Sequence, residues 1–436
     1  MDLQAVILAG GKGSRMTELT RNRSKALLPV GNFPLIYFPM KMLQNAGFDE
    51  VIVICQESLK GPLESLLKKF SLRLNLDVIT IPDDDEMGTA DALRLAGDRI
   101  KEDLLVVSCD VITDFEIQRL WELHKLNESS LTALLSPFPY PTRKVLVPGH
   151  KSKQILERDL VAIDPGTNQL IMLASEADFE ESFSLKMSIL EGHPHVRVFS
   201  NLTDAHVYIL KKWLIPFLSD HSNMSMLKGE VIPYIVKKQF SSFTKQNPKA
   251  KAKDIGECIE EDEESKLVMD RSAWSDPCQG RKLRAFARIR GADEGFCFRV
   301  NTLTAFTHVN SQLFDLLPKV LSADELSLLK TNQSRSSPRC VIGDGTNLGE
   351  RCDVKGSIVG DHCQIGAKVT ISNCIIMDHV IINEGCVLVG SIICDKACIE
   401  ENAEVRDSIV GSRQTISAKA KVNREVISVA DSLLEI

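Results

Sequence analysis

The sequence predicts an α/β domain followed by a coil of short, stacked strands, and three observations lead to this fold class. Residues 5–9, AVILA, form a buried-strand pattern that runs directly into two glycines. Up to about residue 240, short apolar runs alternate with amphipathic segments, which is typical of βαβ units in a mostly parallel sheet. From residue 340 onward, a 17-residue unit repeats five times without a gap.

Size and composition favour a globular protein with two or three domains. The chain has 436 residues and a net charge of −7, which argues against nucleic acid as a main ligand. No apolar run approaches the roughly 18 residues of a membrane span, so we expect a cytosolic protein without a membrane partner. The twelve cysteines include no CxxC pair, which favours buried free thiols over zinc ligands or disulfides.

The predicted domain boundaries follow changes in residue composition and pattern along the chain. Residues 1–242 form the α/β domain, and a lysine block followed by an acidic block predicts a charged flexible loop at 243–283. We expect a hairpin and helix at 284–315 to complete the first domain, and a connector at 316–339. The stacked coil occupies 340–426, and 427–436 form a C-terminal tail.

The repeat has three aliphatic positions per unit. Its third residue is always Ile or Val, and apolar anchors recur six and twelve residues later, as in Val359, Ile365 and Ile371. Each unit therefore supplies three short strands, and stacking buries what no single unit could bury alone. The pattern resembles the left-handed parallel β-helices built from hexapeptide repeats.

The first glycine-rich loop is suited to phosphate. Gly10, Gly11 and Gly13 allow a sharp turn that brings backbone N–H groups close to an anion. Arg15 and Lys25 add two cations, and a guanidinium matches the geometry of phosphate. A tight strand-to-loop turn without any ligand is the alternative reading.

Further motifs identify a resemblance. LAGGKGSRM…SKALLPVG is followed by GTADAL, which begins at Gly88, and by LLVVSCDVI, which ends a strand near Asp110. In this order they resemble the Rossmann-like nucleotidyltransferases that make sugar nucleotides. The resemblance implies a base-side loop at Gly88 and a magnesium ligand at Asp110. In this family a sugar phosphate attacks a nucleoside triphosphate, and Mg²⁺ neutralises the developing charge.

The family's second metal-binding aspartate is missing from the matching stretch. FCFRVNTLTAFTHVN, residues 296–310, keeps the family's register at Thr302, Phe306 and Asn310, which puts Arg299 where the aspartate should stand. An arginine repels Mg²⁺ instead of binding it. Asp204, near the start of an apolar strand, is the candidate second carboxylate if this register is wrong.

A second departure concerns the sugar phosphate. The stretch SEADF puts Ala177 where the family has a lysine, and Cys109 replaces the usual glycine before Asp110. Asp91 fills a variable position of the base-side loop and decides nothing. We therefore expect a vestigial pocket that has lost turnover and needs no cofactor or metal. Binding of a nucleotide or sugar phosphate without catalysis stays open.

Other titratable residues give weaker signals. His362 and His379 share one position of successive repeats, and we expect them to stack at a corner of the coil rather than to catalyse acyl transfer. The acidic run PDDDEMG, residues 82–88, has no partner at ligand spacing, so we expect a solvated loop there.

Five stretches of the sequence, which include positions that depart from the nucleotidyltransferase pattern, resemble one family in particular. IPDDDEMGTADALR, VVSCDVITD, TDAHVYILKKW, GEVIPYIVKKQFSS and FCFRVNTLTAF look like the gamma subunits of the guanine-nucleotide exchange factor for eukaryotic translation initiation factor 2. The resemblance implies a non-catalytic regulatory and scaffold subunit of a cytosolic complex. Its partners would be a catalytic epsilon subunit, the other exchange-factor subunits and initiation factor 2. The sequence ends at Ile436, directly after the predicted β-helix, so we expect no exchange activity from this chain alone.

An active enzyme is the alternative interpretation. The intact GGKGSRM and Lys25 would also suit a sugar-nucleotide pyrophosphorylase, for example one of the mannose-1-phosphate guanylyltransferase type.

Overall fold

A computed structural model describes residues 1–83, 85, 87–140, 144–156, 158–179, 185, 187–240, 283–328 and 339–428. Its contacts divide the chain into two compact units. The first unit comprises Met1–Gly11, Met42–Pro139 and Glu157–Cys297, and the second comprises Lys12–Lys41, Tyr140–Leu156 and Phe298–Ile436. The chain thus passes between the units several times. Of the predicted 243–283 loop, only residue 283 lies within the described residues.

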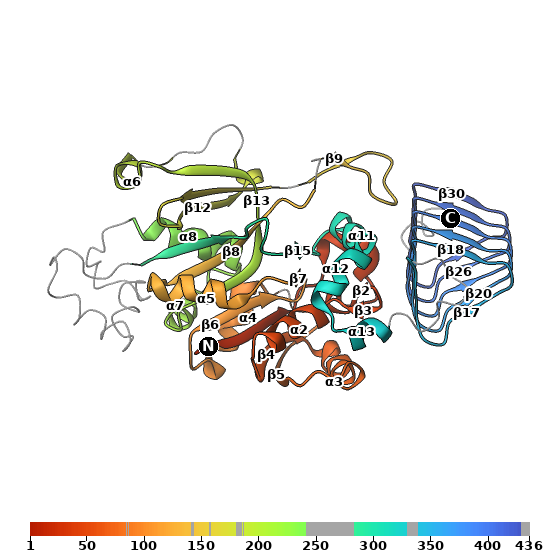
Figure 1. Ribbon diagram of the computed structural model, residues 1–436, viewed down its shortest axis with the longest axis horizontal. Coiled ribbons are helices and arrows are strands. Elements are labelled where there is room, and N and C mark those ends of the chain that lie inside the picture. Colours follow the sequence, from red (N-terminus) through yellow and green to blue (C-terminus); the bar gives the residue numbers. More distant parts are fainter. Residues whose placement is uncertain are drawn as a thin grey trace. The chain divides into compact units, whose positions relative to one another are not determined.

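The first unit is built on a nine-stranded mixed sheet with the order β11-β12-β14-β8-β13-β6-β1-β4-β5 (Figure 1). The strands are, in chain order, β1 (Gln4–Ala9), β4 (Glu50–Gln56), β5 (Asn75–Ile81), β6 (Leu104–Ser108), β8 (Leu131–Pro137), β11 (Asp159–Asp164), β12 (Gln169–Ser175), β13 (Arg197–Leu210) and β14 (Ala285–Ile289). The part β6-β1-β4-β5 is parallel, as the alternating pattern predicts. The long β13 runs antiparallel to both β6 and β8.

Both faces of this sheet are buried under helices. Val6 and Leu8 lie in one core cluster with residues of α4, α7 and α8, whereas the intervening Ile7 is equally buried on the opposite face. A strand buried on both sides reads as a continuous apolar run, which is why AVILA predicts it. The helices of this unit are α3 (Lys60–Lys69), α4 (Thr89–Leu95), α5 (Ile117–Leu126), α6 (Met187–Gly192), α7 (Leu214–Asp220) and α8 (Ile232–Lys238).

The hairpin predicted within 284–315 does not form. β14 joins the large sheet between β12 and β8, whereas the next strand, β15 (Cys297–Arg299), belongs to a separate two-stranded sheet. Alternating apolar residues indicate strands but not which strands pair, and here each strand pairs elsewhere. Two helices follow, α11 (Leu303–Ser311) and α12 (Leu313–Val320), and α13 (Ala323–Leu328) lies within the predicted connector.

The second unit contains a parallel β-helix with three walls (Figure 1). The first wall consists of β16 (Val341–Ile342), β19 (Ile358–Val359), β22 (Ile375–Ile376), β25 (Ile392–Ile393), β28 (Ile409–Val410) and β31 (Val426–Ile427). The second consists of β17 (Asn347–Leu348), β20 (Gln364–Ile365), β23 (Ile381–Ile382), β26 (Cys398–Ile399) and β29 (Thr415–Ile416). The third consists of β18 (Asp353–Lys355), β21 (Thr370–Ser372), β24 (Val387–Val389), β27 (Glu404–Arg406) and β30 (Lys421–Asn423).

The 17-residue period sets the register of this coil. Each strand pairs with the strand 17 residues later, for example Ile342 with Val359 and Val359 with Ile376. The third position of every repeat is buried, as predicted, at 0 to 5% exposure. One corner is formed by residues with positive φ at one repeat position: Gly345, His362, His379, Lys396 and Arg413.

The rest of the second unit consists of short elements. They are η1 (Ser14–Met16), α1 (Thr17–Thr20), η2 (Lys25–Leu27), β2 (Pro29–Val30), β3 (Phe33–Pro34), β9 (Lys144–Val145) and β10 (Gln154–Ile155), with α11 to α13. The helix α2 (Tyr37–Asn45) spans the boundary between the units. Within the described residues, no helix has the length and apolar character needed to cross a membrane.

Candidate functional site

The residues of the predicted phosphate pocket are divided between the two units. Gly10, Gly11, Gly88, Asp110 and Ala177 belong to the first unit. Gly13, Arg15, Lys25 and Arg299 belong to the second.

The turn after β1 needs glycine for structural reasons. Gly13 has a φ of 75°, and an added Cβ would lie 2.7 Å from Cγ2 of Thr20. Its carbonyl oxygen accepts hydrogen bonds from the backbone N–H of Met16 at 2.8 Å and from the Thr20 hydroxyl at 3.1 Å. A Cβ on Gly11, by contrast, would meet nothing within 4 Å. The conformation of the turn explains why position 13 is glycine without invoking a ligand. The packing around Gly11 does not explain why that position is glycine.

The two predicted cations follow this turn on short helical segments. Arg15 is exposed on η1, and Lys25 is half-buried as the first residue of η2. Both segments are short because the chain turns again within a few residues.

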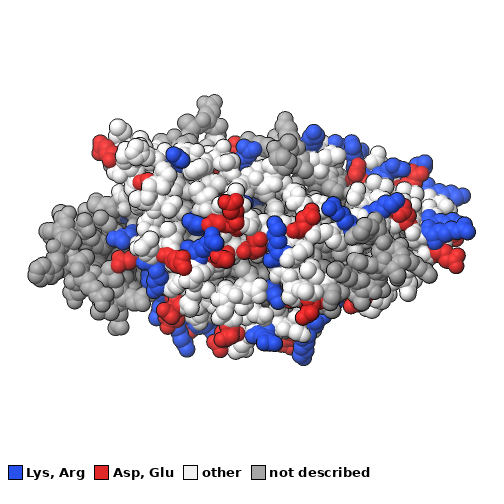
Figure 2. Space-filling model, in the orientation of Figure 1, with Lys and Arg blue, Asp and Glu red and all other residues white. Residues whose placement is uncertain are grey.

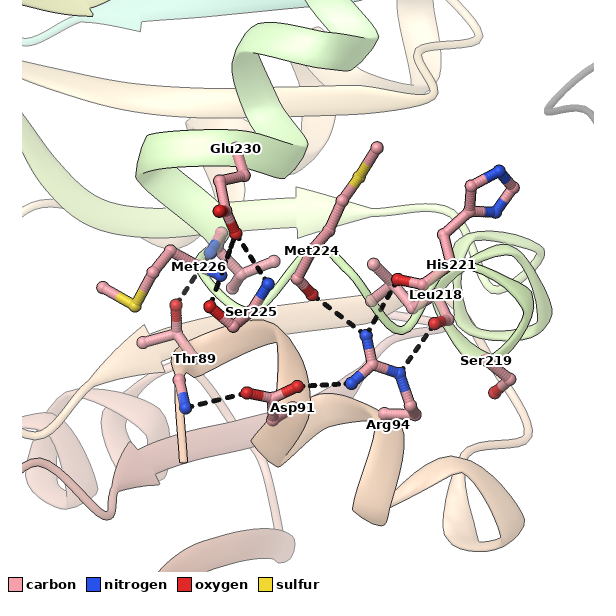
Figure 3. Close-up of polar contacts among 12 residues, drawn as sticks. Thr89, Asp91, Arg94, Leu218, Ser219, His221, Met224, Ser225, Met226 and Glu230 are labelled. Atoms are coloured by element: carbon pink, nitrogen blue, oxygen red, sulfur yellow. Dashed lines mark hydrogen bonds and ion pairs between the residues drawn. The ribbon is translucent and has the colours of Figure 1, made fainter. Parts of the chain in front are cut away.

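The predicted base-side loop is fixed by a dense hydrogen-bond network (Figure 3). Gly88 caps α4, and its N–H donates to the Asp91 carboxylate at 3.0 Å. A Cβ on Gly88 would lie 2.1 Å from the carbonyl oxygen of Ser225, which accepts a hydrogen bond from the backbone N–H of Ala90 at 2.8 Å. Gly88 is therefore required by backbone packing. Asp91, which the sequence leaves without a role, caps the helix.

Arg94 ties this loop to the segment after α7. Its guanidinium donates to the carbonyl oxygens of Leu218, His221 and Met224 at 2.7, 3.2 and 3.0 Å, and it pairs with Asp91 (Figure 3). On the same segment, the Glu230 carboxylate accepts from the N–H groups of Ser225 and Met226. The contacts of Arg94 with Leu218, His221 and Met224 could not be found from the sequence, because they join residues more than 120 positions apart.

Asp110 lies two residues after the end of β6, close to where the sequence predicts it, and is completely buried. The preceding Cys109 donates its N–H to the carbonyl oxygen of Leu8 at 3.0 Å, which fixes the chain next to β1.

Asp204, the alternative second carboxylate, lies on β13, the neighbour of β6. One of its oxygens accepts the N–H of His206 at 2.9 Å, and the other accepts the hydroxyl of Tyr208. Burial raises the pKa of the Asp204 carboxyl, and the nearby Lys228 ammonium opposes this shift. Both oxygens serve the chain itself, which favours a structural role.

A neighbouring ion pair was not found from the sequence. Lys228 Nζ lies 2.9 Å from the carboxylate of Asp159, and Asp159 also accepts the N–H of Asp204 at 3.0 Å. Lys228 lies on η6 (Leu227–Val231), a short π-helical turn. Two buried carboxylates and one lysine thus form a closed cluster beside β13.

The motif residues that keep the family's register have structural roles. Thr302 caps α11 by accepting the N–H of Ala305 at 3.2 Å, and Phe306 is completely buried. The side-chain oxygen of Asn310 accepts the N–H of Gly31 at 3.2 Å. The stretch has therefore kept the residues that build the fold around it.

The two departures lie at ordinary positions of the backbone. Arg299 ends β15 and is half-buried. Ala177 lies on η5 (Glu176–Asp178), a single exposed turn whose cap is Ser175. Nothing in these local conformations requires arginine or alanine.

The predicted stacking of His362 and His379 is confirmed. Their ring centroids are 5.2 Å apart, with an interplanar angle of 14°. Beside them runs a ladder of four aspartates, Asp344, Asp361, Asp378 and Asp395. The backbone N–H of each of the first three donates to Oδ1 of the aspartate one repeat later. Arg23 pairs with Asp378 at 2.6 Å and with Asp395 at 3.1 Å. The shared repeat position was visible in the sequence, but the arginine partner was not.

The described cysteines are free, as the spacing predicts. Burial raises the pKa of Cys374 to about 11 and that of Cys394 to about 12, which keeps these thiols protonated. In the described part of the chain, no group of three or more His, Cys, Asp or Glu side chains is placed to hold a metal ion.

Comparisons with known proteins agree with this architecture. Residues 4–144 match the family described as "Nucleotidyl transferase", and residues 322–422 match the "EIF2B subunit epsilon LbH domain". These matches define the class: a nucleotidyltransferase domain joined to a β-helix.

The relatives are more specific. The chain is 30% identical to translation initiation factor eIF2B subunit gamma of Schizosaccharomyces pombe, over 81% of this chain and 74% of the relative. It is 27% identical to the Dictyostelium discoideum gamma subunit, over 81% and 86%. A mannose-1-phosphate guanyltransferase of Emericella nidulans is 31% identical, but over only 35% and 43%. The chain belongs to the family of eIF2B gamma subunits.

Proposed function

We propose that this chain is a non-catalytic regulatory and scaffold subunit of the cytosolic guanine-nucleotide exchange factor for translation initiation factor 2. In this complex it pairs with the catalytic epsilon subunit, and GDP is exchanged for GTP on the initiation factor. The observation that carries the proposal is the similarity to gamma subunits over 81% of the chain. The proposal includes a left-handed winding of the β-helix.

The contrast within the motif 296–310 supports the loss of turnover. Thr302 and Asn310, which build the fold, keep the family's residues. Arg299 and Ala177, which would have supplied the metal and sugar-phosphate contacts, do not. This pattern is expected of a domain that is under selection to keep its fold but not its catalytic activity, because the residues that build the fold are retained and the catalytic ones are replaced. Gly10, Gly11, Gly13, Arg15, Lys25, Gly88 and Asp110 then form a vestigial pocket, which can bind a nucleotide or sugar phosphate without reaction.

The first test is an assay of pyrophosphate release by the purified chain with Mg²⁺, each nucleoside triphosphate and several sugar phosphates. We expect no release above that of the Lys25→Ala variant. Sugar-dependent release that Lys25→Ala abolishes would contradict the proposal. It would favour the second candidate function, a mannose-1-phosphate guanylyltransferase, which is supported by the shorter match to such an enzyme.

The second test addresses the complex. When the chain is co-expressed with an epsilon subunit, we expect the two to elute together in size-exclusion chromatography. Release of GDP from initiation factor 2 should be absent with this chain alone and faster with the pair than with the epsilon subunit alone. Exchange by this chain alone would refute a non-catalytic role.

A further inference from the structure

A polar pocket in the second unit has no place in the proposed function. It has a volume of about 300 Å³ and lies between residues 17–22 and the last coil of the β-helix. Hydroxyl and amide side chains dominate its wall: Thr17, Asn22, Ser412, Gln414 and Ser428. The volume is close to the lower end of the range of small-molecule sites.

The polar side chains of this pocket are not used by the described chain. Among the described residues, the side chains of Asn22, Gln414 and Arg21 form no hydrogen bond or ion pair with one another or with their neighbours. Elsewhere in this unit, comparable side chains are engaged, as Asn32 is with the carbonyl oxygen of Val359 at 2.8 Å. A concave surface with several unused donors and acceptors is suited to a ligand with many hydroxyl groups.

Both walls of the pocket are held in place. The Arg23 guanidinium fixes one wall by pairing with Asp378 and Asp395 of the β-helix. In the other wall, Gly411 is buried and donates its N–H to the carbonyl oxygen of Ile427 at 2.8 Å. A site whose walls are already fixed loses little entropy when a ligand binds.

The charge around the pocket favours an anion. The repeat at 408–424 contains four Lys or Arg residues and no Asp or Glu, whereas the repeat at 391–407 contains five acidic and two basic residues. All four cations are exposed: Arg413, Lys419, Lys421 and Arg424. Two of them face carboxylates of the preceding coil, because Lys421 lies 3.3 Å from Glu404 and Arg424 lies 3.8 Å from Asp407. Figure 2 shows basic side chains gathered at the upper right, over the coils near β30. The guanidinium of Arg21 adds a cation to the pocket wall, opposed by the single carboxylate of Glu18.

We propose that this pocket binds a small phosphorylated polyol, such as a sugar phosphate. The hydroxyl and amide side chains bind the polyol, and the Glu18 carboxylate accepts one of its hydroxyl groups. Arg21 binds the phosphate within the positive field of the last coil. None of the residues that line this pocket belongs to the vestigial pocket, whose second-unit residues are Gly13, Arg15 and Lys25, and none is the degenerate position Arg299.

The test is isothermal titration of the full chain with glucose 1-phosphate, and with glucose and inorganic phosphate as its two halves. We expect saturable binding of glucose 1-phosphate that weakens as salt is added, and at least about tenfold weaker binding of either half. Asn22→Ala and Gln414→Ala should each weaken binding severalfold, and Arg21→Ala about tenfold, because it removes a charged hydrogen bond.

Two variants serve as controls. Gln364→Ala removes an exposed glutamine of the second wall, outside the pocket, and should leave binding unchanged. In Lys25→Ala, which removes a cation of the vestigial pocket, the saturable phase that Gln414→Ala weakens should persist. Loss of binding in Lys25→Ala but not in Gln414→Ala would assign the ligand to the vestigial pocket and overturn the proposal. No saturable binding up to about 10 mM would also overturn it. Inorganic phosphate binding as tightly as glucose 1-phosphate would overturn the polyol part.

Discussion

The interiors of the two units differ in whether they contain ionisable side chains. The first unit buries Asp110, His124, Asp159 and Asp204 at 5% exposure or less. In the described part of the β-helix, the buried polar side chains are three serines, Ser357, Ser391 and Ser408. An interior that holds charged groups must satisfy each of them individually, whereas stacked coils fill their interior with aliphatic side chains and thiols.

This difference indicates where each unit can place chemically active side chains. The first unit retains carboxylates inside its fold, and those of Asp159 and Asp204 are bound by other groups of the chain. A β-helix interior has no room for such groups, so its chemistry is confined to corners, walls and ends. The aspartate ladder, the stacked histidines and the basic last coil all lie there.

The largest expected effect separates the inside of the β-helix from its outer face. Ile381 and Ile382 are neighbours on β23, but Ile381 is 40% exposed and Ile382 is 1% exposed. Ile382→Ala should lower the free energy of unfolding by about 2–5 kcal/mol, because it opens a cavity in a rigid stack. Ile381→Ala should change it by less than about 1 kcal/mol. Chemical denaturation followed by circular dichroism measures both, and equal losses would contradict the assignment of inner and outer faces.

The next effect tests the buried ionisable groups of the first unit. His124 donates to or accepts from the Thr132 hydroxyl at 2.9 Å, and burial lowers its pKa from 6.5 to about 3. Below pH 6.5 the unfolded chain therefore binds a proton that the folded chain does not. His124 should cost about 1.4 kcal/mol of stability per pH unit as the pH falls, or about 2 kcal/mol at pH 5.

The measurement is the free energy of unfolding at pH 7, 6 and 5. His124→Gln keeps a polar side chain near Thr132 and should flatten the loss between pH 6.5 and pH 5. His362→Gln, at an exposed corner of the β-helix, is the matched control, and comparing the two variants gives the part of the loss that is specific to position 124. If both variants gave the wild-type slope, acid sensitivity would have to come from other groups.

The comparison also explains how much the sequence could predict. The period of 17 residues specified the register, the inward positions and the stacked histidines, because every repeat places the same position in the same environment. Apolar runs in the same way predicted β1 and β6. These signals are local or periodic, so one sequence carries them in full.

Contacts between distant segments could not be predicted in this way. The Lys228–Asp159 ion pair joins residues 69 positions apart, and the Arg23–Asp378 pair joins residues 355 apart. Lysine and arginine are common on protein surfaces, so their presence in the sequence does not indicate that they form these ion pairs. For the same reason the partners of β14 were missed. The cap formed by Asp91, by contrast, is local, because it joins Asp91 to Gly88 three residues earlier. Each of these ion pairs joins segments of one unit that are far apart in the sequence.

The smallest expected effect concerns Arg23, which holds residues 17–22 on the β-helix. Its side chain is 22% exposed and bridges two aspartates of the ladder. A pair this exposed is partly screened, so Arg23→Ala should cost only about 1 kcal/mol. Arg23→Lys should recover part of this loss, because an ammonium keeps the charge but not the fork that reaches both carboxylates. The Lys355–Asp353 pair, at 62 and 51% exposure, offers the control, and Lys355→Ala should cost less than about 0.5 kcal/mol.

Hydrogen exchange gives Arg23 a more sensitive test than global stability. The variant should exchange faster at the backbone amides of residues 17–22 and at the aspartate corner, whereas the amides of β18 and β21 on the third wall should keep their protection. Arg23→Ala should also weaken glucose 1-phosphate binding if the pocket depends on a fixed wall. Unchanged exchange at 17–22 would mean that the buried side chains of Leu19 and of Met16, the residue before this segment, hold it without the ion pair. The charges at the corner would then contribute to solubility rather than to the pocket.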